Sequence, residues 1–462
     1  MFTKAMISIK YRLNDSHGRM YSNWDILCLF VPLLLERLLN QVLGLADTMM
    51  VSSVNDIAVS AMGLYNKAMT PVSVIATGIV SSASIYATQL YGKRDYDLAL
   101  KYIKNMILLH YAFSLPVFLL KTVFGEYFFG LMYPGISRDV LDLLKHISWV
   151  YAPGFLIGGL SSAFGTIFVC QGNMRITVST NLIVGTLNVF GNFLFINVFH
   201  WGVTGACVST MICTYIRFFI YLYKVRQKDM PIHFEFKSWK SFLPRKDRTK
   251  NLLKMSFANS LGSFLYSYAK VLLATLVIAC GTVALNADTV AHELAGLYVL
   301  AGNVVGELIR IIIGHCKGAG KLDDTLYFAK KLLKISMLCQ TVFALILTLL
   351  INFFMATYHL SPEAATLSKQ LTLPYFFLGI VFWTLAYAPE HIFNACGDIK
   401  YTVTVTSVCT WVLRVGFSFI MFYFTPLGIW SVWVSSYMEW IAKTICNLIH
   451  FKRRKWLKKE IL

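Results

Sequence analysis

Long apolar segments, separated by short polar stretches, follow one another along the whole chain. Each is long enough to cross a bilayer as a helix, which takes about 20 apolar residues. We predict twelve such spans, at residues 26–54, 60–90, 102–124, 144–169, 174–198, 202–224, 252–281, 288–315, 327–356, 368–394, 400–423 and 427–450. The pattern therefore predicts an all-α polytopic membrane protein with twelve transmembrane helices.

The connections between these spans alternate in charge. The amino-terminal arm, the long connection 224–254 and the tail from Lys452 to Lys455 are strongly basic, whereas the segment after the first span carries only Asp56. Basic residues concentrate on the cytoplasmic side of membrane proteins. We therefore expect a multi-pass protein of the cell (inner) membrane with both termini in the cytoplasm. The net charge of +19 is then a sign of membrane orientation, and no nucleic-acid partner is expected.

Three short motifs recur at a nearly constant spacing. Residues 171–178 match residues 396–403 at an offset of 225, 202–205 resemble 428–431, and 91–95 resemble 318–323. This spacing superposes spans 1–6 on spans 7–12 with the same orientation. It predicts two parallel six-helix lobes related by a pseudo-two-fold axis along the membrane normal, a plan common among alternating-access carriers.

The predicted domain boundaries follow from the same pattern. We expect a cytoplasmic amino-terminal arm at 1–25, an N-lobe at 26–224, a basic cytoplasmic linker at 225–251, a C-lobe at 252–450 and a basic cytoplasmic tail at 451–462.

The first span carries a polar stripe. Glu36, Asn40 and Asp47 fall within about 40° of one another on a helical wheel. A carboxylate facing lipid costs several kcal/mol, so this stripe is expected to face protein or a wet cavity. Asp47 is a candidate ion or proton site. The alternative is that both acids only pair with neighbouring helices, and Arg37 beside Glu36 makes that alternative stronger for Glu36.

The fifth span places Asn181, Asn188 and Asn192 on one face. Asp47 and Asn192 lie at similar distances from the outer ends of their helices, so the two side chains could share one depth. A carboxylate with two amide carbonyls would suit a hard cation such as Na⁺, giving a possible metal site at Asp47, Asn188 and Asn192. The same group could instead bind a proton. Alternatively, the asparagines only join helices together.

The seventh span carries a basic counterpart. Asn259, Ser263, Tyr266 and Lys270 share one helical face, and no acid lies within a turn of Lys270. A lysine within a membrane needs a partner or loses its proton. We expect Glu36, Asn40, Asn181, Asn259, Tyr266 and Lys270 to line a substrate cavity. The alternative for Lys270 is a structural cation.

Other charged residues favour structural roles. Glu307 and Arg310 are spaced for a local pair, and Arg414 and Glu439 are predicted to pair between helices. The sequence contains no phosphate-binding Gly-x-x-x-x-Gly-Lys-Ser/Thr loop and no His-Glu-x-x-His motif, so we expect no ATP-driven engine within the chain, no enzymatic activity and no cofactor.

The segment Leu43 to Ser60, with Asp47 followed by Thr48 and an apolar run, resembles the first helix of multidrug and toxin extrusion (MATE) transporters. Glu36, the stretch 259–270, the turn Gly397-Asp398 and the stretch 411–418 resemble a bacterial subgroup of that family. The resemblance covers about residues 27–456. It implies two six-helix lobes forming a V and export driven by Na⁺ or H⁺ entry, with the family's first-helix acid at Asp47 and its helix-5 polar pair at Asn188 and Asn192.

The chain departs from the family pattern in two places. Asn192 stands where some members carry an acid, and the seventh span has Gly262 and Lys270 where members that couple through the second lobe carry an acid. These departures favour the first lobe as the coupling site.

The expected function is a secondary antiporter that exports a small organic cationic or amphipathic solute in exchange for Na⁺ or H⁺. Its partners would be that small molecule and membrane lipid, and the chain would act as a monomer. Two alternatives stay open from the sequence: a lipid-linked oligosaccharide flippase that uses a cationic cavity around Lys270 and Arg310, and a membrane-embedded lipid-modifying enzyme.

Overall fold

The fold was determined as a computed structural model of the 462-residue chain. The structure describes residues 19–52, 56–133, 137–227, 230–234, 245–358 and 361–459, without the side chains of residues 42–52, 56–60, 155, 156 and 357.

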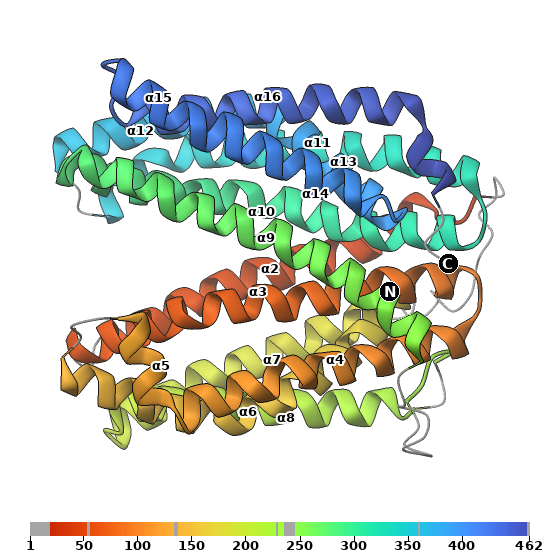
Figure 1. Cartoon of the computed structure of the whole chain (residues 1–462), viewed down its shortest axis with the longest axis horizontal. Coiled ribbons are helices and arrows are strands. Elements are labelled where there is room, and N and C mark those ends of the chain that lie inside the picture. The colour runs from red at the N-terminus through yellow and green to blue at the C-terminus, as the bar shows by residue number, and fades with distance from the viewer. Residues whose placement is uncertain are drawn as a thin grey trace. The chain divides into compact units, whose positions relative to one another are not determined.

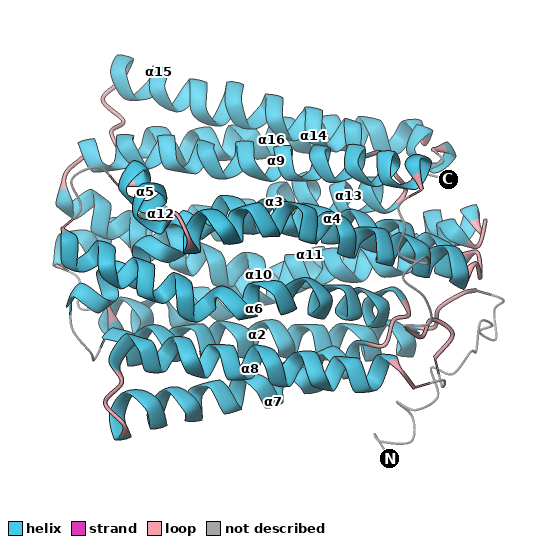
Figure 2. Ribbon diagram, turned by 60° about the horizontal axis from the view of Figure 1, so that its bottom comes forward, coloured by secondary structure: helices cyan, strands magenta, loops and turns pink. Residues whose placement is uncertain are grey.

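Throughout these residues the regular secondary structure is helical (Figure 2). The first half contains α2 (Asn23–Ser52), α3 (Asp56–Gly92), α4 (Tyr96–Thr122), α5 (Gly125–Met132), α6 (Arg138–Cys170), α7 (Met174–Asn192), the π-helix η2 (Phe193–Val198) and α8 (Gly202–Val225). The second half contains α9 (Lys246–Ala279), α10 (Thr282–Gly318), α11 (Leu322–Thr357), α12 (Pro362–Leu378), the π-helix η4 (Gly379–Trp383), α13 (Thr384–Ala395), α14 (Ile399–Val408), the π-helix η5 (Cys409–Gly416), α15 (Phe417–Phe424), α16 (Trp430–Arg453) and the 3₁₀ turn η6 (Lys455–Lys458).

Because the π-helices continue their neighbours, these elements form twelve long helical segments in the described part of the chain (Figure 1). Among the described residues, nine helices are long and apolar enough to cross a membrane, and the bent pair Arg138–Gly154 and Ile157–Cys170 makes a tenth candidate. The other two long segments, α2 and α16, carry charged residues within the helix. The all-α, twelve-span prediction is confirmed.

The chain divides into two compact units. Unit 2 is Val31–Ser260, and unit 1 combines Met1–Phe30 with Leu261–Leu462. Both α2 and α9 therefore begin in one unit and end in the other. The lobe boundaries predicted above stay a prediction.

In unit 2, α6 packs against α3, α4 and α8, and α7 lies against α8. In unit 1, α10 packs against α11, α12 and α13, while α16 lies against α13 and η5. Helix α10 is the core of unit 1, because 67% of its most apolar stretch is buried. Its small residues Ala287, Ala291 and Ala301 are fully buried and let neighbouring helices approach closely.

Both described ends of the chain bind to unit 1. The Met20 backbone N–H donates to Asp324 (3.1 Å), the Arg19 guanidinium lies 3.4 Å from the centroid of the Tyr327 ring, and Tyr21 bonds to His315. At the other end, Trp456 is fully buried, the Lys317 ammonium donates to the Leu457 carbonyl, and Lys459 pairs with Asp398 (3.4 Å). These contacts attach the segments that flank the helices to the bundle itself.

The motifs that repeat in sequence also repeat in backbone conformation. Gly172 and Gly397 have positive φ angles of 70° and 90°, and each is followed by an N–H that bonds back to residue 168 or 393, at 2.9 and 2.8 Å. Arg94 and Gly320, 226 residues apart, have φ angles of 63° and 73°. A residue in this left-handed conformation lets the backbone N–H groups after a helix bond to carbonyls of its last turn. The internal repeat is therefore present in the turns.

The helix boundaries differ from the prediction in one informative place. The stretch 125–142 was expected to be a loop, but Gly125–Met132 forms α5 and α6 begins at Arg138. Phe129 explains the extra helix, because its side chain is fully buried among residues of α3 and α6. Apolar burial thus stabilises a helix too short for a span.

Candidate functional site

The polar residues of α2 and α7 meet within unit 2. The Nδ2 group of Asn181 donates a hydrogen bond to Oε1 of Glu36, whose side chain is partly buried. Asn40, one turn further along α2, is exposed. Two residues predicted to line a cavity, Glu36 and Asn181, are thus brought together, and the carboxylate has a neutral donor.

The side chain of Asp47 lies outside the described residues, so only its place on the backbone is known. The described part of α2 extends to Ser52, five residues beyond Asp47, and the continuous segment of α7 and η2 ends at Val198, six residues beyond Asn192. Both positions belong to unit 2. The helix ends are therefore compatible with the common depth that the sequence predicts.

The two asparagines nearest that depth differ in surroundings. Asn192 is 1% exposed at the end of α7, where the π-helix η2 begins. Asn188 faces α8, because its Nδ2 group donates to Ser209 (3.3 Å) and Thr210 (3.4 Å), and the Ser209 hydroxyl donates to its backbone carbonyl. Hydroxyl and amide oxygens, which suit a hard cation, are thus concentrated on this part of α7 and α8.

Asn259 contacts α3 within unit 2. It lies in the half of α9 that belongs to unit 2, and its Nδ2 group donates to Ser82 of α3 (2.8 Å). The next residue, Ser260, donates to the Ile75 carbonyl. The structure therefore gives Asn259 a helix-packing contact, whereas Tyr266 and Lys270 belong to unit 1.

Unit 1 contains a buried ion-pair network whose first half joins η5 to α16. Nη1 of Arg414 lies 3.1 Å from Oε2 of Glu439, and the Thr410 hydroxyl donates to Oε1 of the same carboxylate (2.7 Å). Glu439 is fully buried and Arg414 is 8% exposed. The pair predicted from the sequence is confirmed. The wide turn of a π-helix, a feature often found at functional sites, carries both Arg414 and Thr410.

The second half of the network joins α16 to α13. Lys443 is fully buried, and its ammonium lies 3.0 Å from Oε1 of Glu390 and 4.0 Å from Glu439. Thr406 donates to Glu390 (2.8 Å), and the Lys443 ammonium lies 4.0 Å from the ring centroid of Tyr387. Buried charges of this kind are tolerated only when they are paired and hydrogen-bonded.

Tyr266 and Lys270 adjoin this network on α9. The Nη1 group of Arg414 donates to the Tyr266 hydroxyl (3.4 Å), and the Lys270 ammonium lies 5.0 Å from the centroid of the Tyr266 ring. Lys270 itself is exposed. Together these side chains join four helical segments of unit 1. We call them the unit 1 charge network, which consists of Tyr266, Lys270, Tyr387, Glu390, Thr406, Thr410, Arg414, Glu439 and Lys443.

Two buried lysines were missed by the sequence analysis. Lys443 follows Glu439 by four residues, a spacing that favours a pair on one helical face, so a signal was present. Lys121 is 1% exposed and donates to the Tyr65 hydroxyl (2.9 Å). It lies one residue before the end of α4, where a lysine normally reaches toward water, so its burial could not be predicted from the sequence.

The predicted local pair is also confirmed, with Arg310 NH2 2.7 Å from Glu307. In the ranges that the structure describes, no group of three or more His, Cys, Asp or Glu side chains could hold a metal ion. The possible Na⁺ site at Asp47, Asn188 and Asn192 stays a prediction, because the Asp47 side chain is outside those ranges.

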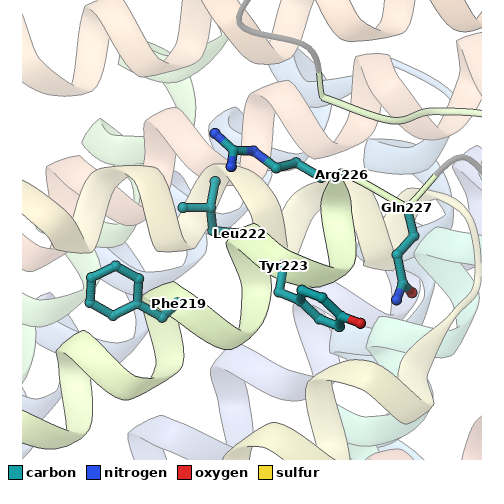
Figure 3. Close-up of a pocket in the computed structure, with 5 residues that line it drawn as sticks. All are labelled: Phe219, Leu222, Tyr223, Arg226 and Gln227. Atoms are coloured by element: carbon teal, nitrogen blue, oxygen red, sulfur yellow. The ribbon is translucent and has the colours of Figure 1, made fainter.

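A pocket of about 390 Å³ lies elsewhere, along the last turns of α8 (Figure 3). It is lined by Phe219, Leu222, Tyr223, Arg226 and Gln227, side chains of one helix end. Phe219 and Tyr223 are 59% and 66% exposed, as expected of a surface facing lipid. None of the predicted site residues lines this pocket, so we assign it no part in transport.

Comparisons with known proteins identify the family. The MatE family model matches residues 32–194 and 259–420, that is, a similar stretch in each half of the chain. The chain is 20% identical over 445 residues to the "Probable multidrug resistance protein NorM" of Thermotoga maritima, covering 95% of this chain and 94% of that protein. It is 21% identical to the "Uncharacterized transporter YisQ" of Bacillus subtilis, covering 93% and 94%.

The fold agrees with these relatives. A solved structure described as an outward-facing conformation of a multidrug resistance MATE family transporter of the MOP superfamily superposes with a TM-score of 0.84 at 18% identity, covering 94% of this chain and 96% of that one. These relatives are named as transporters, not as enzymes. The chain is a multi-pass membrane protein, and it belongs to the MATE family of transporters.

Proposed function

We propose that this protein is a secondary active exporter that exchanges a small organic cationic or amphipathic solute for Na⁺ or H⁺ across the cell (inner) membrane, with both termini in the cytoplasm. The observation that carries the proposal is the family match over both halves of the chain, residues 32–194 and 259–420. Relatives named as multidrug resistance proteins support efflux as its direction.

The proposed coupling site is Asp47 with Asn188 and Asn192. Three observations support it. The helix ends are compatible with a common depth, Asn192 is buried, and the hydroxyls of Ser209 and Thr210 lie beside Asn188. Binding of the entering ion would neutralise the Asp47 carboxylate. For exchange to be linked, the ion and the solute must each bind the two conformations of the carrier with different affinities.

Glu36 and Asn181 would line the solute path in unit 2, with the exposed Asn40 beside them. The Glu36 carboxylate is only partly buried and accepts a hydrogen bond from Asn181, so it can take part in a polar lining of that path.

The test uses proteoliposomes that enclose a pH-sensitive dye, with ethidium as the probe solute. We expect ethidium movement that depends on an imposed pH or Na⁺ gradient, and comparison of the two gradients identifies the coupling ion. Ethidium movement equal to that of protein-free liposomes under both gradients would refute the proposed exchange for this solute class.

A further inference from the structure

The charges of the unit 1 charge network do not balance. Its bases are Lys270, Arg414 and Lys443, and its acids are Glu390 and Glu439. Each acid has a basic partner of its own, Glu439 with Arg414 at 3.1 Å and Glu390 with Lys443 at 3.0 Å. Lys270 is therefore the positive charge in excess among the described residues of this network.

Lys270 and Tyr266 present their polar groups together. They are four residues apart on α9, a spacing that places side chains on one face. The Tyr266 oxygen accepts a hydrogen bond from Arg414, so its own O–H remains to donate elsewhere. The Lys270 side chain is exposed, and its ammonium, with three donors, lies 5.0 Å from the centroid of the Tyr266 ring. The pair thus offers hydrogen-bond donors and a positive charge.

Two further polar groups of the network are buried. Nε of Arg414 and the hydroxyl of Tyr387 are among the buried polar atoms that have no hydrogen-bond partner in the described part of the chain. The Nε group can only donate, and a guanidinium carries its charge at every relevant pH. A buried polar group without a partner costs about 1–3 kcal/mol, so an acceptor in reach of these donors would be stabilising.

From these observations we infer that Lys270 and Tyr266 form a binding position for a carboxylate group of the exported solute. This inference rests on the proposed export function and refines its substrate class: among the exported solutes, those that also carry a carboxylate bind more tightly. Glu439 pairs with Arg414 and Glu390 pairs with Lys443, so the charge of Lys270 is left for the ligand. A purely cationic solute such as ethidium gains no favourable contact at this position.

The test compares two dyes that differ only at one carboxyl group, rhodamine B with a free carboxylate and its ethyl ester. Binding to the purified protein in phosphatidylcholine nanodiscs is measured by fluorescence anisotropy. We expect the parent to bind rhodamine B at least about tenfold more tightly than the ester, the size of one charge-assisted hydrogen bond. Lys270→Gln should abolish that preference, Lys270→Arg should keep most of it, and Tyr266→Phe should reduce it.

A matched control is Lys334→Gln, which removes an exposed lysine of α11 outside the network and should leave the preference unchanged. Loss of the preference for rhodamine B in Lys270→Gln supports the inference only if the melting curve of that variant, followed by tryptophan fluorescence, matches the parent's. If that variant does not fold, the Tyr266→Phe and Lys270→Arg results decide. Equal affinity of the parent for both dyes, or the same preference in parent and Lys270→Gln, would overturn the inference.

An anionic lipid headgroup could offer similar chemistry, so the measurement is repeated with phosphatidylglycerol in the nanodiscs. An unchanged preference supports a solute site, whereas its disappearance would assign the position to lipid and overturn the inference. These results do not depend on an ion gradient. The proposed exchange has a test of its own. It is refuted if neither the rhodamine dyes nor ethidium cross the membrane under a pH or Na⁺ gradient.

Discussion

The ion pair between Glu439 and Arg414 gives the sharpest prediction about stability. Glu439→Gln keeps the shape of the side chain and one carbonyl acceptor for Thr410, but it removes the charge facing Arg414. Charges 3.1 Å apart attract by roughly 5 kcal/mol at an effective dielectric constant of about 20. The amide recovers about 1–2 kcal/mol as a hydrogen-bond acceptor. We therefore expect the variant to lose about 3 kcal/mol of unfolding free energy, within the range measured when one partner of a buried pair is removed.

The assay is SDS titration in mixed micelles followed by tryptophan fluorescence. Trp383, Trp411, Trp430, Trp433, Trp440 and Trp456 all lie in unit 1, so the signal reports mainly on that unit. The control is Glu363→Gln, an exposed glutamate in the first turn of α12, which should cost no more than about 1 kcal/mol. The double variant Arg414→Met with Glu439→Met should recover most of the loss, because apolar residues can replace a buried pair. If Glu439→Gln is as stable as the control variant, the pair does not hold η5 to α16.

Two further predictions concern helix packing and the carboxy-terminal tail. Gly205→Ala would place a methyl group 2.9 Å from the Phe195 backbone and should cost about 1–3 kcal/mol of unfolding free energy in SDS titration, whereas Gly63→Ala, with nothing within 4 Å, should be neutral or slightly stabilising. Equal effects of the two would contradict this packing. Trp456→Ala removes a fully buried ring packed on Phe451 and should speed tryptic cleavage of the tail at least about tenfold, since such truncations cost about 3–5 kcal/mol. Unchanged cleavage would mean that the ring does not hold the tail.

The spans and turns could be predicted from sequence because their causes are local. Apolar length marks a span, and a glycine after a helix marks a turn, so the matching turns at Gly172 and Gly397 were visible as a repeat. The helix α5 was missed because it depends on the burial of Phe129 among residues distant in sequence. The π-helix η5 was also missed, since its sequence has no periodicity that distinguishes it from an α-helix.

Only part of the candidate site could be predicted, because its contacts join residues that are far apart in the chain. Single charged residues in a span indicate a constrained environment, so Lys270, Arg414 and Glu439 could be selected from sequence alone. Which of them meet depends on how helices far apart in the chain face one another. The pairing of Glu390 with Lys443 needs the register of α13 against α16, and the contact of Asn259 with Ser82 needs the register of α9 against α3.

The proposed exchange depends on an ion bound at Asp47, and everted membrane vesicles can test this dependence. Ethidium uptake into the vesicles is measured under an imposed pH or Na⁺ gradient for the parent, for Asp47→Asn and for Asp142→Asn, whose side chain is 71% exposed on α6 and serves as the control. We expect Asp47→Asn to lose gradient-driven uptake while its expression and melting curve stay like the parent's, and Asp142→Asn to transport normally. Uptake by Asp47→Asn as fast as that of the parent would contradict this dependence.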